Sequence, residues 1–437
     1  MKRWGWILAL LRQEALWLAT GRNNVSGFAG FRKEALWLAA GCFTLVFFSV
    51  LSVALAQVRV TKSMNEVSVL DISRFIGQSD GAPAVFRQTL EADLKASGWF
   101  SLTVGGRAEF SLLGEATLAG ASLEVRCEAY NVASRERLLS KTYPKTDRDF
   151  RQLAHKMADD IVLALTGRKG MAATRILMVG NRTGKKEVYL CDADGHNLRQ
   201  LTRDNTISMA PKWSPDGSRF VYTSFRSQFP DVYLVNLNTG DRKCIANYPG
   251  LNSSAAFSPD GRAVALILSK DGNPDLYIKD LDGRDLTRLT STRRAAEASP
   301  AWSPDGRQIV FVSDMKGTPQ LYVMDRSGGE PRRLTSHGSQ NVDPDWGANG
   351  YIVYCSYIGS YQIFVMNPAT MEFKQVTRED ANYEDPSWAP DGRHIVCTRT
   401  VNYRSRIFMV DTLGGSLLPL LPDSERGDWV APNWSKQ

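Results

Sequence analysis

A motif of seven residues, Pro-x-Trp-Ser-Pro-Asp-Gly, recurs through the C-terminal part of the chain and constrains its fold more than any other feature. Its aromatic residue steps along the sequence by 44, 45, 44, 42 and 46 residues. A repeat of about 40–45 residues is typical of four-stranded propeller blades. The copies are Pro211–Gly217, Ala255–Gly261, Pro300–Gly306, Pro344–Gly350, Pro386–Gly392 and a shorter Pro432–Ser435.

Each repeat predicts the same four strands. In the copy that spans 299–335, Ser303–Gly306 is expected to be a tight turn, because Pro presets φ, Asp can bond the backbone and Gly accepts a positive φ. The apolar and β-branched runs around this turn predict strands, whose two apolar faces would be buried by radial packing of neighbouring sheets. The expected strands are 301–302, 308–313, 320–325 and 332–335, with equivalents of the third at 231–236, 275–280, 362–367 and 406–411.

The first and last copies are incomplete in a complementary way. Residues 174–179, 187–192 and 198–202 are typical of second, third and fourth strands, whereas 428–435 is typical of a first strand. Pairing the two segments would leave no open edge on the ring. The sequence therefore predicts an all-β six-bladed propeller of WD40-like (PD40) repeats over 174–437, closed by the C-terminal strand. An unclosed array of five blades and two partial ones is the alternative.

Composition favours two domains and excludes a nucleic-acid partner. The chain has 437 residues, of which 43% are hydrophobic, and this suffices for two cores. Its formal net charge is +7, but residues 1–56 carry +4 of it. The remaining charge is too even for a nucleic-acid footprint, and no basic run interleaved with aromatic residues occurs in the repeats.

The sequence indicates no metal site, cofactor or catalytic machinery. None of its four histidines has the i, i+4 spacing of a metal pair, and it contains no Gly-x-Ser-x-Gly, Walker or Gly-x-Gly-x-x-Gly motif. Asp192–Gly195 and Asp280–Asp285 look like calcium loops, but Asp-Gly is also the ordinary choice for a hairpin turn at that point of a blade. No disulfide framework is expected, although a single bridge stays open. The six cysteines are Cys42, Cys127, Cys191, Cys244, Cys355 and Cys397.

Residues 1–56 have the pattern of an export leader. The uncharged run Ala35–Ala56 follows Arg32-Lys33 and ends in small residues, which predicts a signal peptide cleaved after Ala56 and a periplasmic protein. The run is long enough to span a bilayer, so an uncleaved anchor is the rival. The segment around Cys42 also resembles a lipoprotein acceptor site, but its apolar stretch follows the cysteine. The near-duplication of 12–21 by 32–41 leaves the true start codon open.

Residues 57–168 lack the repeat and predict an α+β domain. Strands are expected at 67–72, 109–113, 122–130 and 137–143, and a helix at 82–97. The apolar stripe from Phe150 to Leu165 predicts a second helix, with Thr146 and Asp149 as an N-terminal capping box and Gly167 at its end. The fold class is thus an α+β domain followed by a propeller.

The pattern as a whole resembles the TolB family of the Tol–Pal system, over residues 57–437. Beyond the repeats, the resemblance rests on Leu112–Glu115, Glu124–Ser134 and Arg151–Ile161, which occur in the family's order. It implies a non-enzymatic periplasmic scaffold whose propeller docks the peptidoglycan-associated lipoprotein Pal, so that it associates peripherally with the outer membrane and supports its integrity and its constriction at division. It also implies TolA as a second partner through the mature N-terminus, although the segment after Gln57–Lys62 departs from the family's.

The loops that lead into the innermost strands are expected to gather at one mouth of the central channel, where the resemblance places Pal. Glu297, Asp343, Glu384 and Asp385 would make this mouth acidic and suited to a basic partner. The family's usual His is Leu251 here, and the alternative is that the loops are only polar connections. The candidate contact residues are Leu251, Asn252, Ser253, Glu297, Ala298, Ser299, Asn341, Asp343, Glu384 and Asp385.

Two other functions compete with the scaffold. Similar blades cap the hydrolase domain of prolyl-oligopeptidase-like peptidases, but that reading needs a further domain with a nucleophile elbow. The runner-up is an exported propeller that binds a small ligand or sugar in its central channel.

Overall fold

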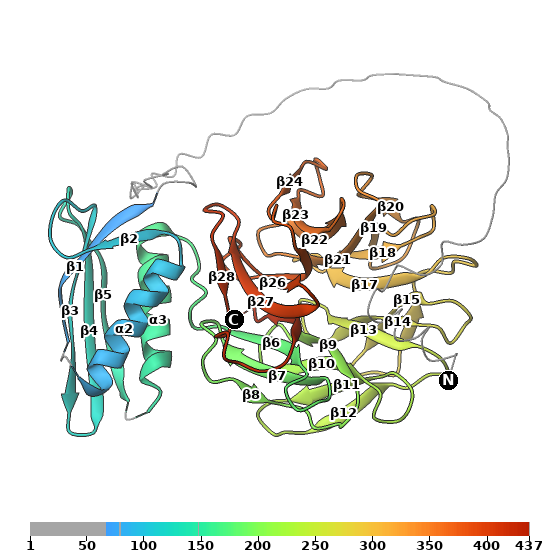
Figure 1. Cartoon of the computed structure of the whole chain (residues 1–437), viewed down its shortest axis with the longest axis horizontal. Helices are drawn as coiled ribbons and strands as arrows, with labels where there is room; N and C mark the ends of the chain where they lie inside the picture. The colour runs from blue at the N-terminus through green and yellow to red at the C-terminus, as the bar shows by residue number, and fades with distance from the viewer. Residues whose placement is uncertain (1–66, 78–79, 147, 437) are drawn as a thin grey trace, which may run out of the picture.

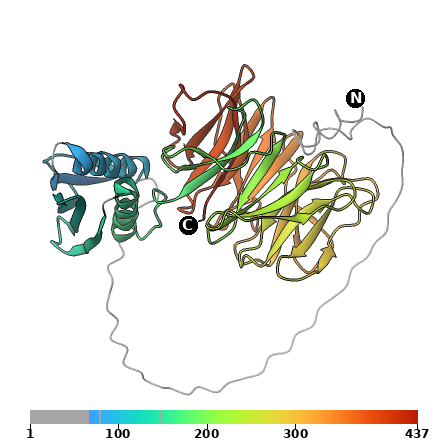
Figure 2. The same ribbon diagram turned by 90° about the horizontal axis from the view of Figure 1, so that it is seen from below.

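The computed structural model describes residues 67–77, 80–146 and 148–436. The leader, its cleavage site, Cys42 and the segment Gln57–Lys62 lie outside these residues. Two bodies follow each other along the chain, a sheet covered by two helices and a ring of sheets (Figure 1). The same two bodies lie side by side in the view from below, with helix α3 on the side nearer the ring (Figure 2).

The first body is a five-stranded sheet in the order β2-β1-β3-β4-β5, with helices α2 and α3 packed on it. The apolar stripes of both helices meet the sheet in one core that includes Phe86, Leu112 and Ile161. The elements are β1 (Ser68–Gly77), α2 (Gly81–Ala96), β2 (Phe100–Thr103), β3 (Phe110–Ala119), β4 (Ser122–Asn131), β5 (Arg137–Thr146) and α3 (Phe150–Thr166).

Two details of this body differ from the prediction. The capping box is wrong, because Thr146 ends strand β5 and its Oγ1 bonds Arg148, while Asp149 makes no side-chain cap. Strand β2 was missed, because its four residues are too short for a pattern; they pair in parallel with β1. Gly167 ends α3 as expected, with a φ of 69° that favours glycine.

The second body consists of six four-stranded antiparallel sheets, as predicted. From the innermost strand outward, blades one to three are β9 (Ser208–Trp213), β10 (Arg219–Ser224), β11 (Asp231–Asn236) and β12 (Arg242–Ala246); β13 (Asn252–Phe257), β14 (Ala263–Leu268), β15 (Asp275–Asp280) and β16 (Leu286–Arg288); and β17 (Glu297–Trp302), β18 (Gln308–Ser313), β19 (Gln320–Asp325) and β20 (Arg332–Arg333).

Blades four and five are β21 (Gln340–Trp346), β22 (Ile352–Tyr357), β23 (Tyr361–Met366) and β24 (Phe373–Gln375); and β25 (Asn382–Trp388), β26 (His394–Val401), β27 (Arg404–Asp411) and β28 (Leu417–Pro419). Blade six is β29 (Trp429–Trp434), β6 (Arg175–Gly180), β7 (Glu187–Asp192) and β8 (Arg199–Gln200). Strands β8 and β20 are shorter than the expected 198–202 and 332–335, because a threonine side chain takes the place of the next backbone acceptor. Leu321 N donates to Thr335 Oγ1 at 3.0 Å, and Val188 N donates to Thr202 Oγ1 at 2.8 Å.

The predicted closure of the ring by the C-terminal strand is confirmed. Strand β29 pairs antiparallel with β6, from Trp429 opposite Gly180 to Trp434 opposite Ile176. Trp434 is completely buried, and its Nε1 donates to Thr174 Oγ1 at 2.7 Å. The last and first strands of the propeller therefore form one sheet, and the ring has no open edge.

The repeated motif builds a turn and an interblade contact. In blade three, Ser303 Oγ donates to Asp305 Oδ1 at 2.6 Å and accepts from Gln308 N at 2.9 Å, which closes the turn. In two blades the motif's tryptophan reaches back to the preceding blade: Trp302 Nε1 donates to Ala256 O at 3.0 Å, and Trp213 Nε1 donates to Asn433 O at 3.1 Å. These two tryptophans thus hold neighbouring blades together.

All five cysteines in the described residues are free thiols. Cys127, Cys191, Cys355 and Cys397 are buried, whereas Cys244 is exposed. None of the helices in the described ranges has the length and apolar character needed to cross a membrane.

Candidate functional site

The innermost strand of every blade breaks its pairing register at the same point, next to one residue with a positive φ. Non-glycine residues adopt this left-handed conformation rarely, and β-bulges of this kind redirect side chains. All six residues line the central channel, and we call them the girdle. They are Ala210, Ser254, Ser299, Asp343, Asp385 and Ala431, with φ of 48°, 54°, 45°, 50°, 53° and 51°.

A proline follows the girdle residue in five of the six blades. Proline has no backbone N–H and cannot donate within a central ladder, so in a strand it marks an edge or a bulge. The proline after the girdle residue is therefore the signal in the sequence for a bulge. The predicted pattern of a strand followed by a turn does not include this bulge. The residues that follow the girdle are Pro211, Ala255, Pro300, Pro344, Pro386 and Pro432.

The channel inside the girdle encloses about 1220 Å³, and one side of its wall is acidic. Asp343, Glu384, Asp385 and Asp428 line it together with Lys186 and Lys212. Neighbouring blades hold these carboxylates in place. Ser299 Oγ donates to Asp343 Oδ1 at 3.1 Å, and Asp385 Oδ2 accepts from Ala431 N at 3.1 Å.

Five of the ten candidate contact residues lie in the channel wall, and five do not. Those in the wall are Ser253, Ser299, Asp343, Glu384 and Asp385. Leu251, Asn252, Glu297, Ala298 and Asn341 are absent from the lining, and all of them except Leu251 are buried. The loops therefore place only part of their residues at the mouth.

The polar residues that are missing from the wall clamp one blade to the next. In blade four, Asn341 Nδ2 donates to Gln320 Oε1 of blade three at 2.9 Å, and the same oxygen accepts from Thr335 at 2.8 Å. Asn252 likewise donates to the carbonyl of Pro230 in the preceding blade at 3.1 Å. Because these side chains fill the space between sheets, they cannot face the channel.

Glu297 is the clearest correction to the predicted acidic mouth. It is 2% exposed, and it accepts hydrogen bonds from Ser313 at 3.0 Å and Thr290 at 3.2 Å. Burial raises the pKa of Glu297 to about 8, and the neighbouring carboxylate of Asp275 adds to the rise. Near neutral pH this group therefore adds little negative charge, and the acidity of the mouth comes from other residues.

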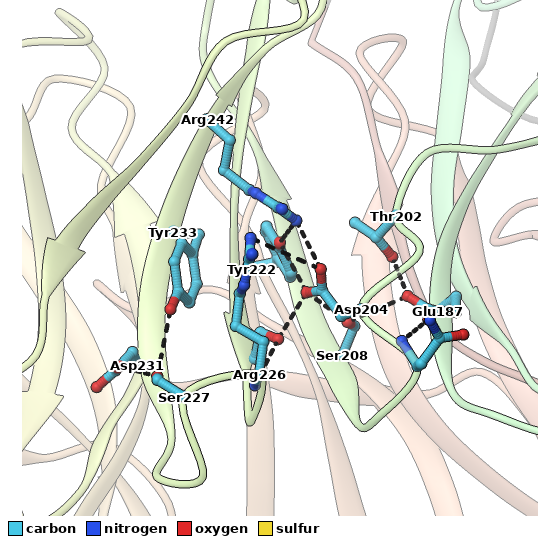
Figure 3. A network of polar contacts seen from close by, with 12 residues as sticks. Glu187, Thr202, Asp204, Ser208, Tyr222, Arg226, Ser227, Asp231, Tyr233 and Arg242 are labelled. Carbon is cyan, nitrogen blue, oxygen red and sulfur yellow. Dashed lines mark hydrogen bonds and ion pairs between the residues drawn. The ribbon is translucent and has the colours of Figure 1, made fainter.

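Blade six meets blade one through the same clamp, joined to a second buried carboxylate (Figure 3). Thr202 Oγ1 donates to Glu187 Oε2 at 2.6 Å, and Ser208 of blade one donates to the same oxygen at 3.4 Å. Arg242 of blade one donates to Asp204 Oδ1 at 2.6 Å. Burial opposes the charge of Asp204, but hydrogen bonds from Ser224 and Tyr222 and the nearby Arg242 hold its pKa below the usual value. This network fixes the connection between the two blades.

The opposite end of the channel is apolar. A cavity of about 250 Å³ lies there, and Lys212 and Pro300 line both this cavity and the main channel. Lys436 Nζ lies 3.3 Å from the carboxylate of Asp345 at this end. The aromatic lining consists of Trp213, Phe257, Trp302, Trp346 and Trp434.

One group of described side chains has the donor atoms and the proximity to hold a metal ion. Asp93, His155 and Asp194 form this group, away from the channel and between the two bodies. The Arg151 guanidinium already contacts the Asp194 carboxylate there. One of the three donor groups is therefore already paired with a cationic side chain.

Comparisons with known proteins match this architecture. A family model described as the TolB beta propeller domain covers residues 162–437. A protein named "Tol-Pal system protein TolB" from Albidiferax ferrireducens is 34% identical over 221 residues, which are 46% of this chain and 52% of the relative. Another of the same name, from Desulfosudis oleivorans, is 32% identical over 161 residues, 37% of this chain and 36% of the relative. The alignments thus span about half or less of these relatives' length.

A solved structure extends the likeness over both bodies. The crystal structure of TolB from Acinetobacter baumannii superimposes with a TM-score of 0.74 at 26% identity, and the match covers 85% of this chain and 97% of that one. The similarity therefore includes the first sheet and its helices as well as the ring.

Proposed function

Because the chain belongs to the TolB β-propeller family, we propose that it is a non-enzymatic scaffold of a Tol–Pal system. The protein would act in the periplasm by binding other proteins and would catalyse no reaction. Its lipoprotein partner would hold it at the outer membrane as a peripheral protein. In this role it would help to maintain the integrity of that membrane and its constriction at division. The name shared by its relatives supports this assignment.

The proposed docking site is the acidic side of the channel mouth, for a Pal-like lipoprotein. The observation that carries this choice is the girdle, whose bulges direct Asp343 and Asp385 into the channel wall beside Glu384. Carboxylates held in place by neighbouring blades need little reordering when a basic partner binds, which reduces the cost of association. Charge complementarity of this kind chiefly sets specificity and the rate of association.

Calorimetric titration tests this docking directly. The purified protein is titrated with the soluble domain of the Pal-like lipoprotein from the same genome, in parallel with variants Asp343→Asn and Asp385→Asn. The matched control is Glu330→Gln, which removes an exposed acidic group outside the channel lining. Each channel variant is expected to weaken binding by about tenfold, which corresponds to ~1.4 kcal/mol.

The outcomes separate the two candidate functions. Unchanged affinity in both channel variants would reject the channel mouth as the docking site. No heat of binding from folded proteins would reject the lipoprotein as partner and move a small ligand or sugar in the channel to first place, since about 1220 Å³ is room enough for one. TolA, as a second partner through Gln57–Lys62, remains a proposal on residues outside the described ranges.

A further inference from the structure

The two bodies touch at two polar contacts on adjacent blades. At the first, the Arg393 guanidinium of blade five lies 4.5 Å from the centre of the Trp99 ring and pairs with Asp411 at 2.6 Å. At the second, Arg151 and His155 of helix α3 face Asp194, which lies in the turn between β7 and β8 of blade six. The second contact also includes His196 of the same turn, whose Nδ1 lies 3.2 Å from the Arg151 guanidinium.

His155 sits between one carboxylate from each body. It is completely buried; its Nδ1 lies 2.7 Å from Asp93 Oδ2 of helix α2, and its Nε2 lies 3.5 Å from Asp194 Oδ2. Asp93 belongs to the same body as His155, whereas Asp194 belongs to the propeller. One imidazole ring therefore bridges the two bodies.

The doubly protonated ring suits this geometry best, because Nε2 makes no hydrogen bond and lies 3.5 Å from a carboxylate oxygen. A neutral imidazole carries a single N–H, so one of its nitrogens would present a lone pair to a carboxylate oxygen. If the proton stays on the Nδ1 side with Asp93, the lone pair at Nε2 faces Asp194, and the attraction between the ring and Asp194 becomes a repulsion, while the Arg151–Asp194 ion pair still joins the two bodies. An imidazolium donates toward both carboxylates and removes this conflict.

The charges around the ring balance when it is protonated. The groups that face it are Asp93 on α2, Arg151 and Asp159 on α3, and Asp194 and His196 on the β7–β8 turn. Asp159 is engaged by the N–H groups of Ala172 and Ala173. The four groups in direct contact, namely His155, Arg151, Asp93 and Asp194, then sum to zero charge.

The pKa values support a proton on this ring. Burial lowers the pKa of His155, but the hydrogen bond to Asp93 and the charges of Asp93 and Asp194 outweigh it and raise the pKa above its usual value. Burial also raises the pKa of Asp194, yet the His196 N–H, His155 and Arg151 together hold it below its usual value. The charged forms of His155 and Asp194 are thus favoured in the docked arrangement, whereas burial raises the pKa of Asp93.

We propose that His155 is a proton-operated latch between the two bodies. With a proton on both nitrogens it adds to the Arg151–Asp194 ion pair and holds the β7–β8 turn tightly against helix α3. On losing one proton it leaves that ion pair alone to hold the turn, which is then held more loosely. The contact of Trp99 with Arg393 is a pivot that stays closed, because hydrogen bonds from Arg393 outweigh burial and lower the pKa of Asp411 to about 2. Deprotonation of His155 would therefore loosen the orientation of the bodies without separating them.

The pH dependence follows from proton linkage. In the loosened form His155 keeps its contact with Asp93 but loses the charge of Asp194, one of the groups that raise its pKa, so its pKa is lower than in the docked form. The ratio of tightly docked to loosened protein is therefore constant below the lower of these two pKa values and falls by up to about tenfold per pH unit toward the pKa of the docked ring. Above that pKa it is constant again.

Distance measurements between two spin labels test the latch. One label goes on the exposed native Cys244 of the propeller, the other on Ser134→Cys in an exposed turn of the first body. Cys42 is replaced by serine so that it takes no label. We expect a narrow distance distribution near pH 6 that broadens as pH rises through the raised pKa of His155.

Two variants and one titration complete the test. Asp194→Asn lies in a propeller turn, so the core of the first body stays intact. This variant should give a broad distribution of label distances at every pH. It should also lower the pKa of His155, which an NMR titration measures. His337→Gln, a half-buried histidine bonded to Tyr354 within blade four, is the matched control and should behave as wild type.

The proposal is overturned by any of three results. They are a distribution that does not change between about pH 6 and pH 9, a wild-type pH response in Asp194→Asn, and a His155 pKa at or below that of an exposed histidine. Narrowing of the distribution by added Zn²⁺ at about pH 8 would also overturn it, in favour of a metal bridge on the same residues.

Discussion

Truncation of Trp434 measures what closure of the ring contributes to stability. Burial of a tryptophan side chain removes about 150–250 Å² from water, worth about 4–6 kcal/mol at ~25 cal/mol per Å². Trp434 is completely buried, so Trp434→Ala should cost the 3–5 kcal/mol usual for large-to-small changes, here about 4 kcal/mol. Trp434→Phe keeps most of the apolar contact and loses the bond to Thr174, a change worth about 1–2 kcal/mol.

Thermal unfolding gives the first readout of these two variants. With a shift of about 2–4 °C per kcal/mol for a body of this size, Trp434→Ala should lower Tm by about 10 °C and Trp434→Phe by about 4 °C. Trp302→Ala is the matched control, because it removes an equivalent buried aromatic away from the seam.

Hydrogen exchange separates closure from simple cavity formation. Opening of the seam exposes the amides of β6 that pair with β29, so Trp434→Ala should speed their exchange, whereas Trp302→Ala should leave them protected. If Trp434→Ala lowered Tm by less than about 2 °C, or left exchange in β6 unchanged, closure by β29 would not be what stabilises the ring.

Two further predictions concern buried charge and thiol exposure. Burial raises the pKa of Glu297 to about 8, so the native state loses stability as pH rises from about 4.3 to about 8. Glu297→Gln removes this loss, so the urea midpoint of the variant should exceed that of wild type near pH 8.5 and equal it near pH 4. The same dependence of the urea midpoint on pH in both proteins would contradict this. Of the five described cysteines, Cys244 is exposed and should react first with a maleimide. Its reaction should be slow near neutral pH, because burial raises the pKa of its thiol. Cys355 and Cys397 should react only when the protein unfolds, and peptide mapping by mass spectrometry checks this order.

The sequence predicted the fold well because the repeat carries its own register. Trp213, Trp302 and Trp434 hold equivalent positions, so one interpreted copy predicts the rest, including closure by the last strand. The strand β2 could not be predicted, since its pairing with β1 is set by tertiary contact and not by local pattern.

The candidate site was predicted only in part, because a loop position does not tell where a side chain points. Asn252 and Asn341 precede the channel residues by only two positions, yet they turn into the interblade space. The direction is decided by a bulge, and its marker was the proline after each girdle residue. The bridge between His155 and Asp194 joins residues 39 positions apart in different bodies and has no sequence pattern.

The seam between β29 and β6 also determines how the molecule bears mechanical load. Strand β6 is the first of the propeller after α3, so a pull on the first body reaches the ring through this strand. Strands β29 and β7 flank it on both sides, and its hydrogen bonds are therefore loaded together in shear rather than broken singly as at an edge strand. Force on the first body would thus enter the ring through a strand that is hydrogen-bonded on both sides.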